Sequence, residues 1–457
     1  MKIDAIDTIY FIGIGGIGMS ALARYMNSLN KKVYGYDKTG TKLTKKLVSE
    51  GIEITYDDDP EQLPENVDLV VYTPAVPKTH KGLLHFQNNG FDVIKRAELL
   101  GRISREKSAI AIAGTHGKTT TSAMTAFLLK YGGIDISAFV GGIMTNFNSN
   151  YIAGEGEWVV LEADEYDRSF LHLNPQISAL ISVDADHLDI YGKADKMQEG
   201  FEAFIAKIKD GGIVILKKEI KLQLSKELLK SLESKAVDVI TFGYEDAEIL
   251  LSNITTREGK FVFDYSYGDK YLKGLETNMA GRHNIENAVI GITIALELGV
   301  AEDNIRKGLN AFKGIKRRFE KIAEKDGKVY IDDYAHHPTE LNAAIQAARE
   351  LYPTKKITGI FQPHLYSRTR DFADGFAEAL SRLDQVILMD IYPAREEPIE
   401  GVSSDMVFEE IAVEHKYRAS KQNVMEVLSG LEFEVLLTLG AGDIDLFIDP
   451  IKEKFFE

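Results

Sequence analysis

The stretch SAIAIAGTHGKTT, residues 108–120, carries the strongest structural signal in this 457-residue chain. The small and apolar residues Ser108–Ala113 predict a buried strand, and a helix is expected to begin just after Gly117. A glycine-rich turn between a strand and a helix, ending in Gly-Lys-Thr-Thr, is the context of a phosphate-binding loop. In such a loop Lys118 can neutralise a transferring phosphate, and the Thr119 hydroxyl can bind magnesium.

This loop predicts that the protein binds a nucleoside triphosphate, ATP or GTP. A strict Walker sequence has glycine where Ile112 stands, so the loop is a shortened variant. His116 can either position a phosphate or cap the helix, and the sequence alone does not separate the two. The residues expected to hold the nucleotide are Gly114, Thr115, His116, Gly117, Lys118, Thr119 and Thr120.

Two acidic segments follow predicted strands of the same region, and magnesium prefers oxygen ligands. The first is Glu162–Glu165, and the second is the run from Asp184 to Asp189. A solvated acidic loop is the simpler interpretation for Asp184 and Asp189. For Glu165 and His187 we favour a role beside the phosphates.

A second glycine motif lies near the N-terminus. Strand Ile9–Ile12 runs into GIGGIG, in which Gly13, Gly15 and Gly18 match G-x-G-x-x-G, and Gly16 lies between them. The next strand ends on Asp37, where an acid can accept a hydrogen bond from a ribose hydroxyl. Taken alone, these residues fit a NAD-type cofactor, another nucleotide diphosphate, or glycines needed only for packing.

Composition narrows the class of protein. The net charge of −16 and the pI near 5.2 argue against a protein that coats nucleic acid. Cysteine is absent, which excludes disulfides and cysteine nucleophiles. The N-terminus lacks the features of a signal peptide, and no run of about 18 apolar residues occurs. We therefore expect a soluble, cytoplasmic protein that does not bind membranes.

Alternating strand and helix patterns predict an α/β fold with three domains, because single cores rarely exceed about 250–300 residues. We place a Rossmann-like domain at 1–105, a central P-loop ATPase-like domain at 106–314, and a Rossmann-like domain at 315–457. Between about 245 and 280 the pattern predicts antiparallel strands at the edge of the central sheet.

Further motifs occur in a fixed order along essentially the whole chain. They are EADEYDRSFLHL (162–173), DADHLDIYG (184–192), GRHNIENA (281–288), RRFE (317–320), DDYAHHPTE (332–340), FQPHLYSRTRDF (361–372) and DIYPAREEPI (390–399). Together with the two glycine loops, this series resembles the Mur ligases of bacterial cell-wall synthesis. The resemblance implies three domains that bind a UDP-sugar, ATP and an amino acid in turn.

The resemblance also implies an activity and a set of site residues. The expected reaction joins the lactyl carboxylate of UDP-N-acetylmuramate to L-alanine through an acyl phosphate, at the expense of ATP and with Mg²⁺. The N-terminal glycines and Asp37 then match the UDP-sugar loop instead of a NAD site. Residues matching ATP contacts are Asn284, Asn287, Arg318 and Asp333; magnesium-site matches are Thr119, Glu165 and His187; substrate-facing matches are His336, His337, His364, Arg368 and Arg370.

Several points stay open at the level of sequence. Among the catalytic candidates Lys118, His187, His336, His337 and His364, the three C-terminal-domain histidines cannot be ranked as the base that frees the amine. Related ligases carry a carbamylated lysine where this chain has Glu202, so none is expected here. The alternatives are a ligase that attaches a preformed tripeptide to the same UDP-sugar, and a NAD-dependent dehydrogenase. We expect a monomer or weak homodimer.

Overall fold

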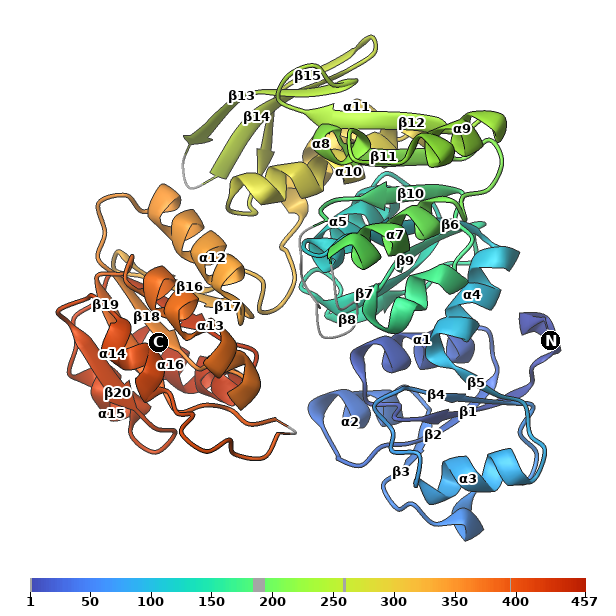
Figure 1. The fold of residues 1–457 in the computed structure, drawn as a ribbon, viewed down its shortest axis with the longest axis horizontal. Coiled ribbons are helices and arrows are strands. Elements are labelled where there is room, and N and C mark those ends of the chain that lie inside the picture. Colours follow the sequence, from blue (N-terminus) through green and yellow to red (C-terminus); the bar gives the residue numbers. More distant parts are fainter. Residues whose placement is uncertain (1, 184–193, 258–259, 395) are drawn as a thin grey trace. The chain divides into compact units, whose positions relative to one another are not determined.

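The computed structural model describes residues 2–183, 194–257, 260–394 and 396–457 (Figure 1). The chain forms two compact units. The first unit comprises Met1–Ile254, Phe263–Glu276 and Glu286–Lys313; the second comprises Thr255–Val262, Thr277–Ile285 and Gly314–Glu457. Three α/β domains, each with its own sheet, confirm the predicted fold class. The domain boundaries near 105 and 314 stay a prediction.

The N-terminal sheet is entirely parallel, with strand order β3-β2-β1-β4-β5. Its strands are β1 (Thr8–Ile12), β2 (Lys32–Tyr36), β3 (Glu53–Thr55), β4 (Leu69–Tyr72) and β5 (Val93–Lys95). Its helices are η1 (Ile3–Ala5), α1 (Ile17–Ser28), α2 (Lys42–Ser49), η2 (Pro60–Gln62), α3 (Lys81–Asn88) and α4 (Arg96–Glu106). The apolar central strand β1 is covered on both faces, as parallel sheets require.

The central sheet has ten strands in the order β15-β14-β13-β12-β11-β10-β6-β9-β7-β8. Its strands are β6 (Ser108–Ala113), β7 (Ile136–Met144), β8 (Ser149–Ile152), β9 (Trp158–Glu162), β10 (Ile177–Leu180), β11 (Ile213–Lys217), β12 (Asp238–Gly243), β13 (Ile249–Arg257), β14 (Lys260–Tyr267) and β15 (Lys270–Thr277). Its helices are α5 (Lys118–Tyr131), η3 (Tyr166–His172), α7 (Ala194–Ile205), α8 (Lys218–Lys221), α9 (Lys226–Ser234), α10 (Arg282–Glu297) and α11 (Glu302–Ala311).

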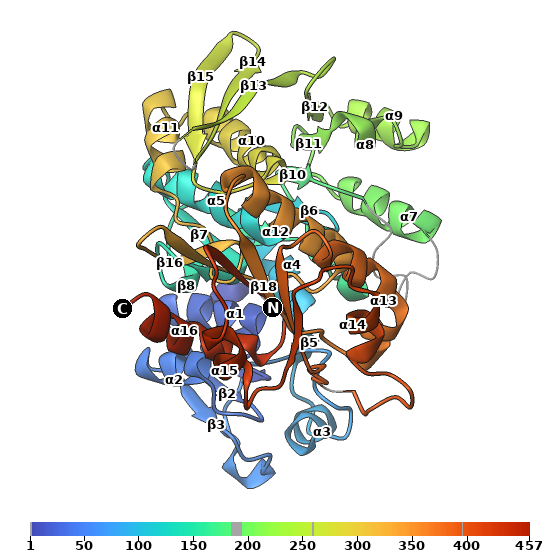
Figure 2. The same ribbon diagram turned by 90° about the vertical axis from the view of Figure 1, so that its left-hand side faces the viewer.

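The last three of these strands, β13, β14 and β15, lie side by side at one end of the central sheet, as the sequence predicts (Figure 2). Where this extension joins the sheet, β13 pairs with β12 in parallel. The antiparallel arrangement of the three appended strands stays a prediction. At the opposite end of the sheet, β7 and β8 pair antiparallel.

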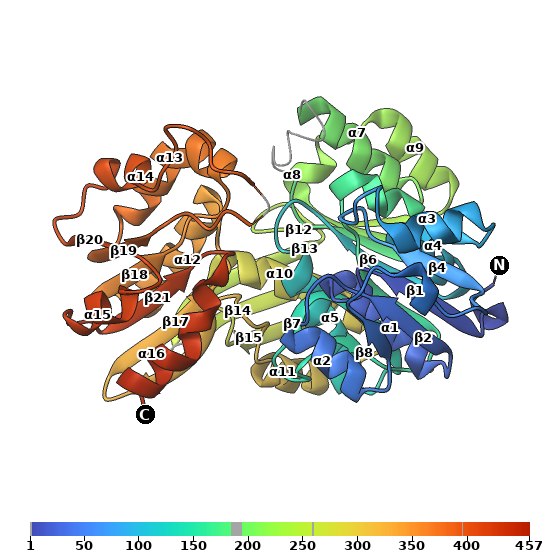
Figure 3. The same ribbon diagram turned by 90° about the horizontal axis from the view of Figure 1, so that it is seen from below.

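The C-terminal sheet has the order β16-β17-β21-β18-β19-β20, and only β16 runs antiparallel to its neighbour. Its strands are β16 (Glu320–Lys325), β17 (Lys328–Asp333), β18 (Ile357–Phe361), β19 (Gln385–Met389), β20 (Lys416–Ala419) and β21 (Val435–Leu439). Its helices are α12 (Pro338–Leu351), α13 (Tyr366–Leu380), α14 (Asp405–Glu410), α15 (Val424–Ser429), η4 (Asp443–Phe447) and α16 (Ile448–Phe455). Helices α13 and α14 cover one face of this sheet, and α15 and α16 cover the other (Figure 3).

Within the first unit, a buried polar cluster joins the N-terminal domain to the central sheet. The guanidinium of Arg24 on α1 pairs with Glu50, with Nε 2.6 Å from Oε2, and donates to the side-chain oxygen of Asn150 on β8. The Asn150 amide nitrogen in turn donates to the carbonyl of Ile17 and to the Ser20 hydroxyl. Buried arginine and asparagine groups are costly unless every partner is present, so this cluster fixes how α1 sits on β8.

Among the described helices, none combines the length and the hydropathy that crossing a lipid bilayer requires.

Candidate active site

The N-terminal glycine loop forms a tight turn between β1 and α1. Gly13 has φ +85°, which favours glycine, and its N–H donates to the Tyr36 carbonyl at 2.8 Å. The Gly15 N–H donates to Asp37 Oδ2 at 2.8 Å, and a Cβ on Gly15 would lie 2.7 Å from that oxygen. Gly16 caps α1. Asp37 therefore holds the loop in shape, a contact that the ribose interpretation did not include.

The phosphate-binding loop of the central domain lies between β6 and α5, as predicted. Gly114 and Gly117 have φ +142° and +81°, conformations that side-chain-bearing residues rarely adopt. Ser182, just beyond β10, holds the loop: its carbonyl accepts from the Thr115 N–H at 3.1 Å, and its hydroxyl accepts from the His116 N–H at 2.9 Å. These hydrogen bonds to Ser182 fix the backbone of the loop.

The two reactive side chains at the start of α5 contact two carboxylates at the end of β9 and just beyond it. Lys118 Nζ lies 2.8 Å from Glu165 Oε1 and also donates to the Gly114 carbonyl at 2.7 Å. The Thr119 hydroxyl donates to Glu162 Oε1 at 2.9 Å, while Glu162 Oε2 accepts from the Gly141 N–H at 2.8 Å. Strand β9 therefore presents both acids to the start of α5.

Burial controls the acidity of Glu165, whose side chain is only 1% exposed. Loss of hydration raises the pKa of Glu165, and the neighbouring Lys118 ammonium lowers it without cancelling the effect of burial. The Lys118 ammonium therefore stabilises the ionised form of a carboxylate that burial alone would disfavour.

The donor set around Thr119 fits a divalent cation that prefers oxygen ligands. It consists of the Thr119 hydroxyl and the Glu162 carboxylate that it contacts, with the Glu165 carboxylate beside the neighbouring Lys118. His187, the remaining predicted ligand, lies outside the described residues. Within the described residues, no group of three histidine or acidic side chains is already arranged around a metal position.

Helix α10 brings one of its two predicted asparagines to the loop. The Asn287 side-chain oxygen accepts from the Thr121 hydroxyl at 3.0 Å, and a Cβ on Gly117 would lie 2.7 Å from it. Asn284, one helical turn earlier, donates to the Ala280 carbonyl at 2.6 Å and is buried. Asn287 thus requires glycine at position 117, and Asn284 secures the start of its own helix.

In the second unit, predicted residues gather after β17 at the carboxyl edge of the sheet. Asp333 accepts from the backbone N–H groups of Phe319 (2.6 Å) and Ala335 (2.7 Å). Burial raises the pKa of Asp333 to about 7, although Arg318 pulls it down. The Arg318 guanidinium lies over the Tyr334 ring, 5.4 Å from its centre.

The histidines of the second unit differ in their surroundings. His336 Nδ1 lies 2.9 Å from the Tyr334 carbonyl, and its ring is 6.2 Å from the His364 ring. Burial lowers the pKa of His336, Glu340 raises it, and Arg368 lowers it further. His337 caps α12 through Nδ1, and its ring packs 4.7 Å from that of Phe372.

The two predicted arginines of α13, Arg368 and Arg370, lie in different surroundings. Arg368 is half-buried and lies close enough to His336 to influence its pKa. Arg370 is exposed and pairs with Asp371 at 2.8 Å. Residues two apart on a helix point in nearly opposite directions, so one substrate group cannot contact both in this helix.

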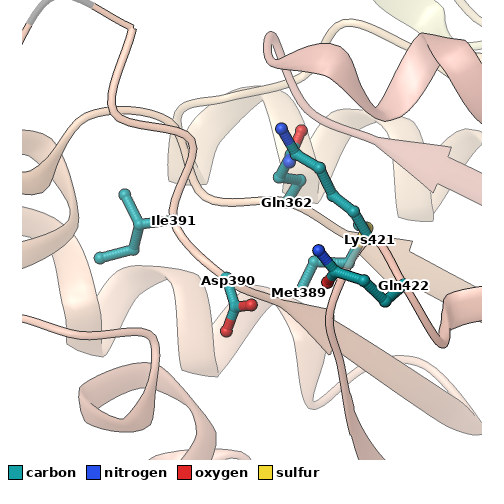
Figure 4. Close-up of a pocket in the computed structure, with 6 residues that line it drawn as sticks. All are labelled: Gln362, Met389, Asp390, Ile391, Lys421 and Gln422. Atoms are coloured by element: carbon teal, nitrogen blue, oxygen red, sulfur yellow. The ribbon is translucent and has the colours of Figure 1, made fainter.

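A small pocket of about 130 Å³ opens at the same carboxyl edge (Figure 4). Its lining residues are Gln362, Met389, Asp390, Ile391, Lys421 and Gln422. Lys421 pairs with Asp443, whose second oxygen accepts from the Gln362 amide at 2.9 Å. Strand β19 leads to the face covered by α14, and β20 leads to the face covered by α15. Such a reversal is where open α/β sheets place ligands.

Three contributors were not predicted individually from the sequence. Glu162 and Ser182 were only parts of acidic or strand-ending segments, and Arg317 stood beside the chosen Arg318. Arg317 pairs with the buried Asp332 at 3.1 Å and donates to the Gly440 carbonyl at 2.6 Å. Glu202, at the place of the carbamylated lysine, accepts from the Ser225 N–H and hydroxyl at the start of α9.

Known protein families match the chain over most of its length. The Mur ligase family catalytic domain matches residues 8–108, the Mur ligase middle domain matches 112–295, and the Mur ligase glutamate ligase domain matches 317–442. Relatives named UDP-N-acetylmuramate–L-alanine ligase include one from Flavobacterium johnsoniae, 45% identical with all of both chains covered. Another, from Porphyromonas gingivalis, is 45% identical and covers 97% of this chain and 98% of its own.

Solved structures agree with this result. The UDP-N-acetylmuramate-alanine ligase of Thermotoga maritima has a TM-score of 0.82 and 28% identity, covering 98% of this chain and 99% of that one. A murein peptide ligase from Psychrobacter arcticus, 22% identical with a TM-score of 0.69, shares the fold over 98% of this chain and 99% of that one. The predicted resemblance is confirmed: the chain belongs to the Mur ligase family.

Proposed function

We propose that this chain joins the lactyl carboxylate of UDP-N-acetylmuramate to the amine of L-alanine and converts ATP to ADP and phosphate. Full-length similarity to relatives of that name supports the substrates. The structural observation that supports ATP use most strongly is the phosphate loop. At the start of the helix that follows it, Lys118 contacts Glu165 and Thr119 contacts Glu162. A dehydrogenase would have no use for that arrangement.

The proposed reaction has two steps. An oxygen of the lactyl carboxylate attacks the γ-phosphorus of ATP, the bond to the β-phosphate oxygen breaks, and ADP leaves. The alanine amine then attacks the carbonyl carbon of the acyl phosphate, inorganic phosphate departs, and the nitrogen loses a proton. Because phosphoryl transfer needs little covalent help, positioning and charge neutralisation are the protein's main tasks.

In the first step, Lys118 compensates the negative charge that develops between carboxylate and γ-phosphate. The loop N–H groups would hold the β- and γ-phosphates, and the Asn287 side chain packs against Gly117, where it leaves no room for a side chain. A magnesium ion bound by Thr119, Glu162 and Glu165 would supply further positive charge to the phosphate oxygens. His187 stays a candidate ligand.

In the second step, we assign the base to His336. Its Nδ1 faces the Tyr334 carbonyl and the Glu340 carboxylate, both acceptors, so Nδ1 carries the hydrogen and Nε2 holds the lone pair. A lowered pKa keeps this ring neutral near pH 7, as a proton acceptor must be. Arg318, Asp333 and Asn284 stay candidates for ATP contacts, and His337, His364, Arg368 and Arg370 for substrate contacts.

Phosphate release tests the assignment. It is measured with each of the common amino acids and the murein tripeptide, with and without UDP-N-acetylmuramate. We expect release only when UDP-N-acetylmuramate and an amino acid are both present, with L-alanine giving the highest kcat/KM. A preference for the tripeptide would favour the recycling ligase, and sugar-independent release would refute the proposal.

ATP and nucleotide sugars are made in the cytoplasm, so the proposal places the enzyme there. We propose a monomer or weak homodimer, for which light scattering over a range of protein concentrations is the test.

A further inference from the structure

Arg96 lies between the N-terminal glycine loop and the acidic segment 162–165 of the first unit. It is the first residue of α4 and directly follows β5, at the carboxyl edge of the N-terminal sheet. Its Nη2 lies 3.1 Å from Asp164 Oδ2, and the side chains of Arg96 and Asp164 are 23% and 39% exposed. Asp164 stands in the chain between Glu162 and Glu165, the acids that contact the phosphate loop.

The other side of the same guanidinium lies against Gly18, the last glycine of the N-terminal motif. A Cβ on Gly18 would lie 2.3 Å from Arg96 Nη1 and 3.4 Å from its Cζ. Gly18 is an ordinary helical residue of α1, unlike Gly13, so its backbone does not require glycine. The space that the missing side chain leaves is taken by the guanidinium.

The position of Arg96 coincides with the ligand crevice expected for this sheet. Along the chain, β1 leads through α1 to β2 on one side, whereas β4 and β5 lie on the other. Ligands of open α/β sheets bind at such a reversal, beyond the carboxyl ends of the strands. Arg96 reaches from β5 past β4 to the start of α1, and so spans this crevice.

Guanidinium chemistry suits a diphosphate. Arginine has five N–H donors in a planar fork that matches phosphate oxygens, and it keeps its charge when partly buried. Asp164 holds one arm of the fork and thereby orients the other toward the loop. Diphosphate on the loop N–H groups would lie beside that second arm.

We propose that Arg96 is a substrate-binding residue whose guanidinium hydrogen-bonds the diphosphate of the UDP-sugar, with Asp164 as its positioning residue. The inference rests on the proposed function, since it takes a UDP-sugar as the ligand of the N-terminal loop. It assigns to Gly18, the third glycine of G-x-G-x-x-G, the purpose of leaving room for the arginine. It also gives Asp164 a role distinct from that of Glu162 and Glu165.

Binding of UDP-N-acetylmuramate, UDP and ATP to Arg96→Ala, measured by calorimetry, tests the inference. Arg102→Ala is the matched control, because Arg102 lies on the same helix and pairs only with surface acids, Asp92 and Glu98, in its described contacts. We expect Arg96→Ala to bind UDP-N-acetylmuramate and UDP about 10- to 100-fold more weakly, the loss expected for charged hydrogen bonds, with ATP binding unchanged. Arg102→Ala should bind all three within about twofold of the unmodified protein.

Three further variants separate ligand contact from simple support. Gly18→Ala should displace the guanidinium and weaken UDP binding, and Asp164→Asn should weaken it less than Arg96→Ala does. Arg96→Lys should recover part of the affinity, because it keeps the charge but loses the fork.

The outcomes distinguish the inference from the proposed function. If Arg96→Ala lost UDP and ATP affinity equally and had a lower melting temperature, Arg96 would only stabilise the fold. Unchanged UDP binding with weakened UDP-N-acetylmuramate binding would place the contact on the sugar or its carboxylate, and would overturn the diphosphate assignment. If the unmodified protein did not bind UDP-N-acetylmuramate, the proposed function itself would fail.

Discussion

Replacing Lys118 with methionine separates the chemical role of this residue from its structural one. Methionine keeps most of the apolar stem and removes the ammonium that lies 2.8 Å from Glu165. Turnover should fall by at least about 10³-fold, because the site loses a charge placed where phosphoryl transfer develops negative charge. Binding of UDP-N-acetylmuramate should stay nearly unchanged, since its loop lies in another domain.

The same change should destabilise the fold by an amount that depends on pH. The side chains of Lys118 and Glu165 are 14% and 1% exposed, and removing one member of a buried pair costs about 3–5 kcal/mol when the other stays charged. Glu165 can avoid this cost by taking up a proton. Burial already raises its pKa, and loss of Lys118 raises it further.

The sign of the pH effect follows from linkage. A carboxyl whose folded pKa is raised is protonated in both the folded and the unfolded chain below about pH 4, so the two proteins should differ least there. As the pH rises through the pKa of Glu165 in the folded, unmodified protein, Glu165 ionises there beside Lys118. In Lys118→Met the same carboxyl must either stay protonated or ionise without a partner, so the stability difference between the two proteins grows. Urea unfolding of the first unit between pH 5 and 8 measures this difference.

A second substitution provides the control. Lys118→Met combined with Glu165→Gln leaves neither member of this buried pair charged, so it should recover most of the lost stability while activity stays low. If Lys118→Met were as stable as the unmodified protein at every pH, the buried pair would have no energetic importance. If Glu165→Gln did not restore stability, the loss would have another origin.

Three further predictions follow from other contacts. Gly117→Ala should weaken ATP binding about 10-fold, because φ +81° costs a side-chain-bearing residue about 1–2 kcal/mol and its Cβ would lie 2.7 Å from Asn287. Gly133→Ala is the control, because Gly133 has φ +88° but open space around it. Equal effects of the two variants in an ATP titration would contradict the argument. Thr119→Val should reduce phosphate release by about 10²-fold or more, and Thr119→Ser should restore it; an active valine variant would remove the hydroxyl from the mechanism. The Asp333 pKa is raised to about 7, so between about pH 4 and 7 the folded chain binds a proton that the unfolded chain has lost, and the free energy of unfolding should fall over this range. Asp333→Asn should make that fall smaller in urea titrations. An unchanged pH dependence in the variant would contradict this prediction.

Local motifs predicted the loops of the site well. Residues 108–120 specify strand, turn and helix within one short segment, so the positions of Lys118 and Thr119 follow from neighbouring residues alone. The same is true of β1, the N-terminal glycines and α1. Strands β7 and β8 were missed, because Gly141 and Gly142 interrupt the first and asparagines surround the second, which lowers strand propensity.

Partners distant in the sequence could not be predicted in the same way. Glu162 meets Thr119 across 43 residues, and Ser182 meets His116 across 66. Neither pairing leaves a periodic trace in the chain, since it depends on which strands become neighbours. Arg317 and Arg318 show the same limit, because spacing does not reveal which of two adjacent arginines turns toward Asp332.

The acids Glu162, at the end of β9, and Glu165, just beyond it, have a consequence for the form in which ATP binds. Lys118, Glu162 and Glu165 together carry one excess negative charge, so a bare triphosphate entering the loop meets electrostatic repulsion. A nucleotide that binds together with a divalent cation carries less net negative charge. The cation can also accept the carboxylates of Glu162 and Glu165 as ligands, in place of their hydrogen bonds to Thr119 and Lys118. The protein should therefore bind metal-bound ATP more tightly than metal-free ATP, even in the absence of the other two substrates.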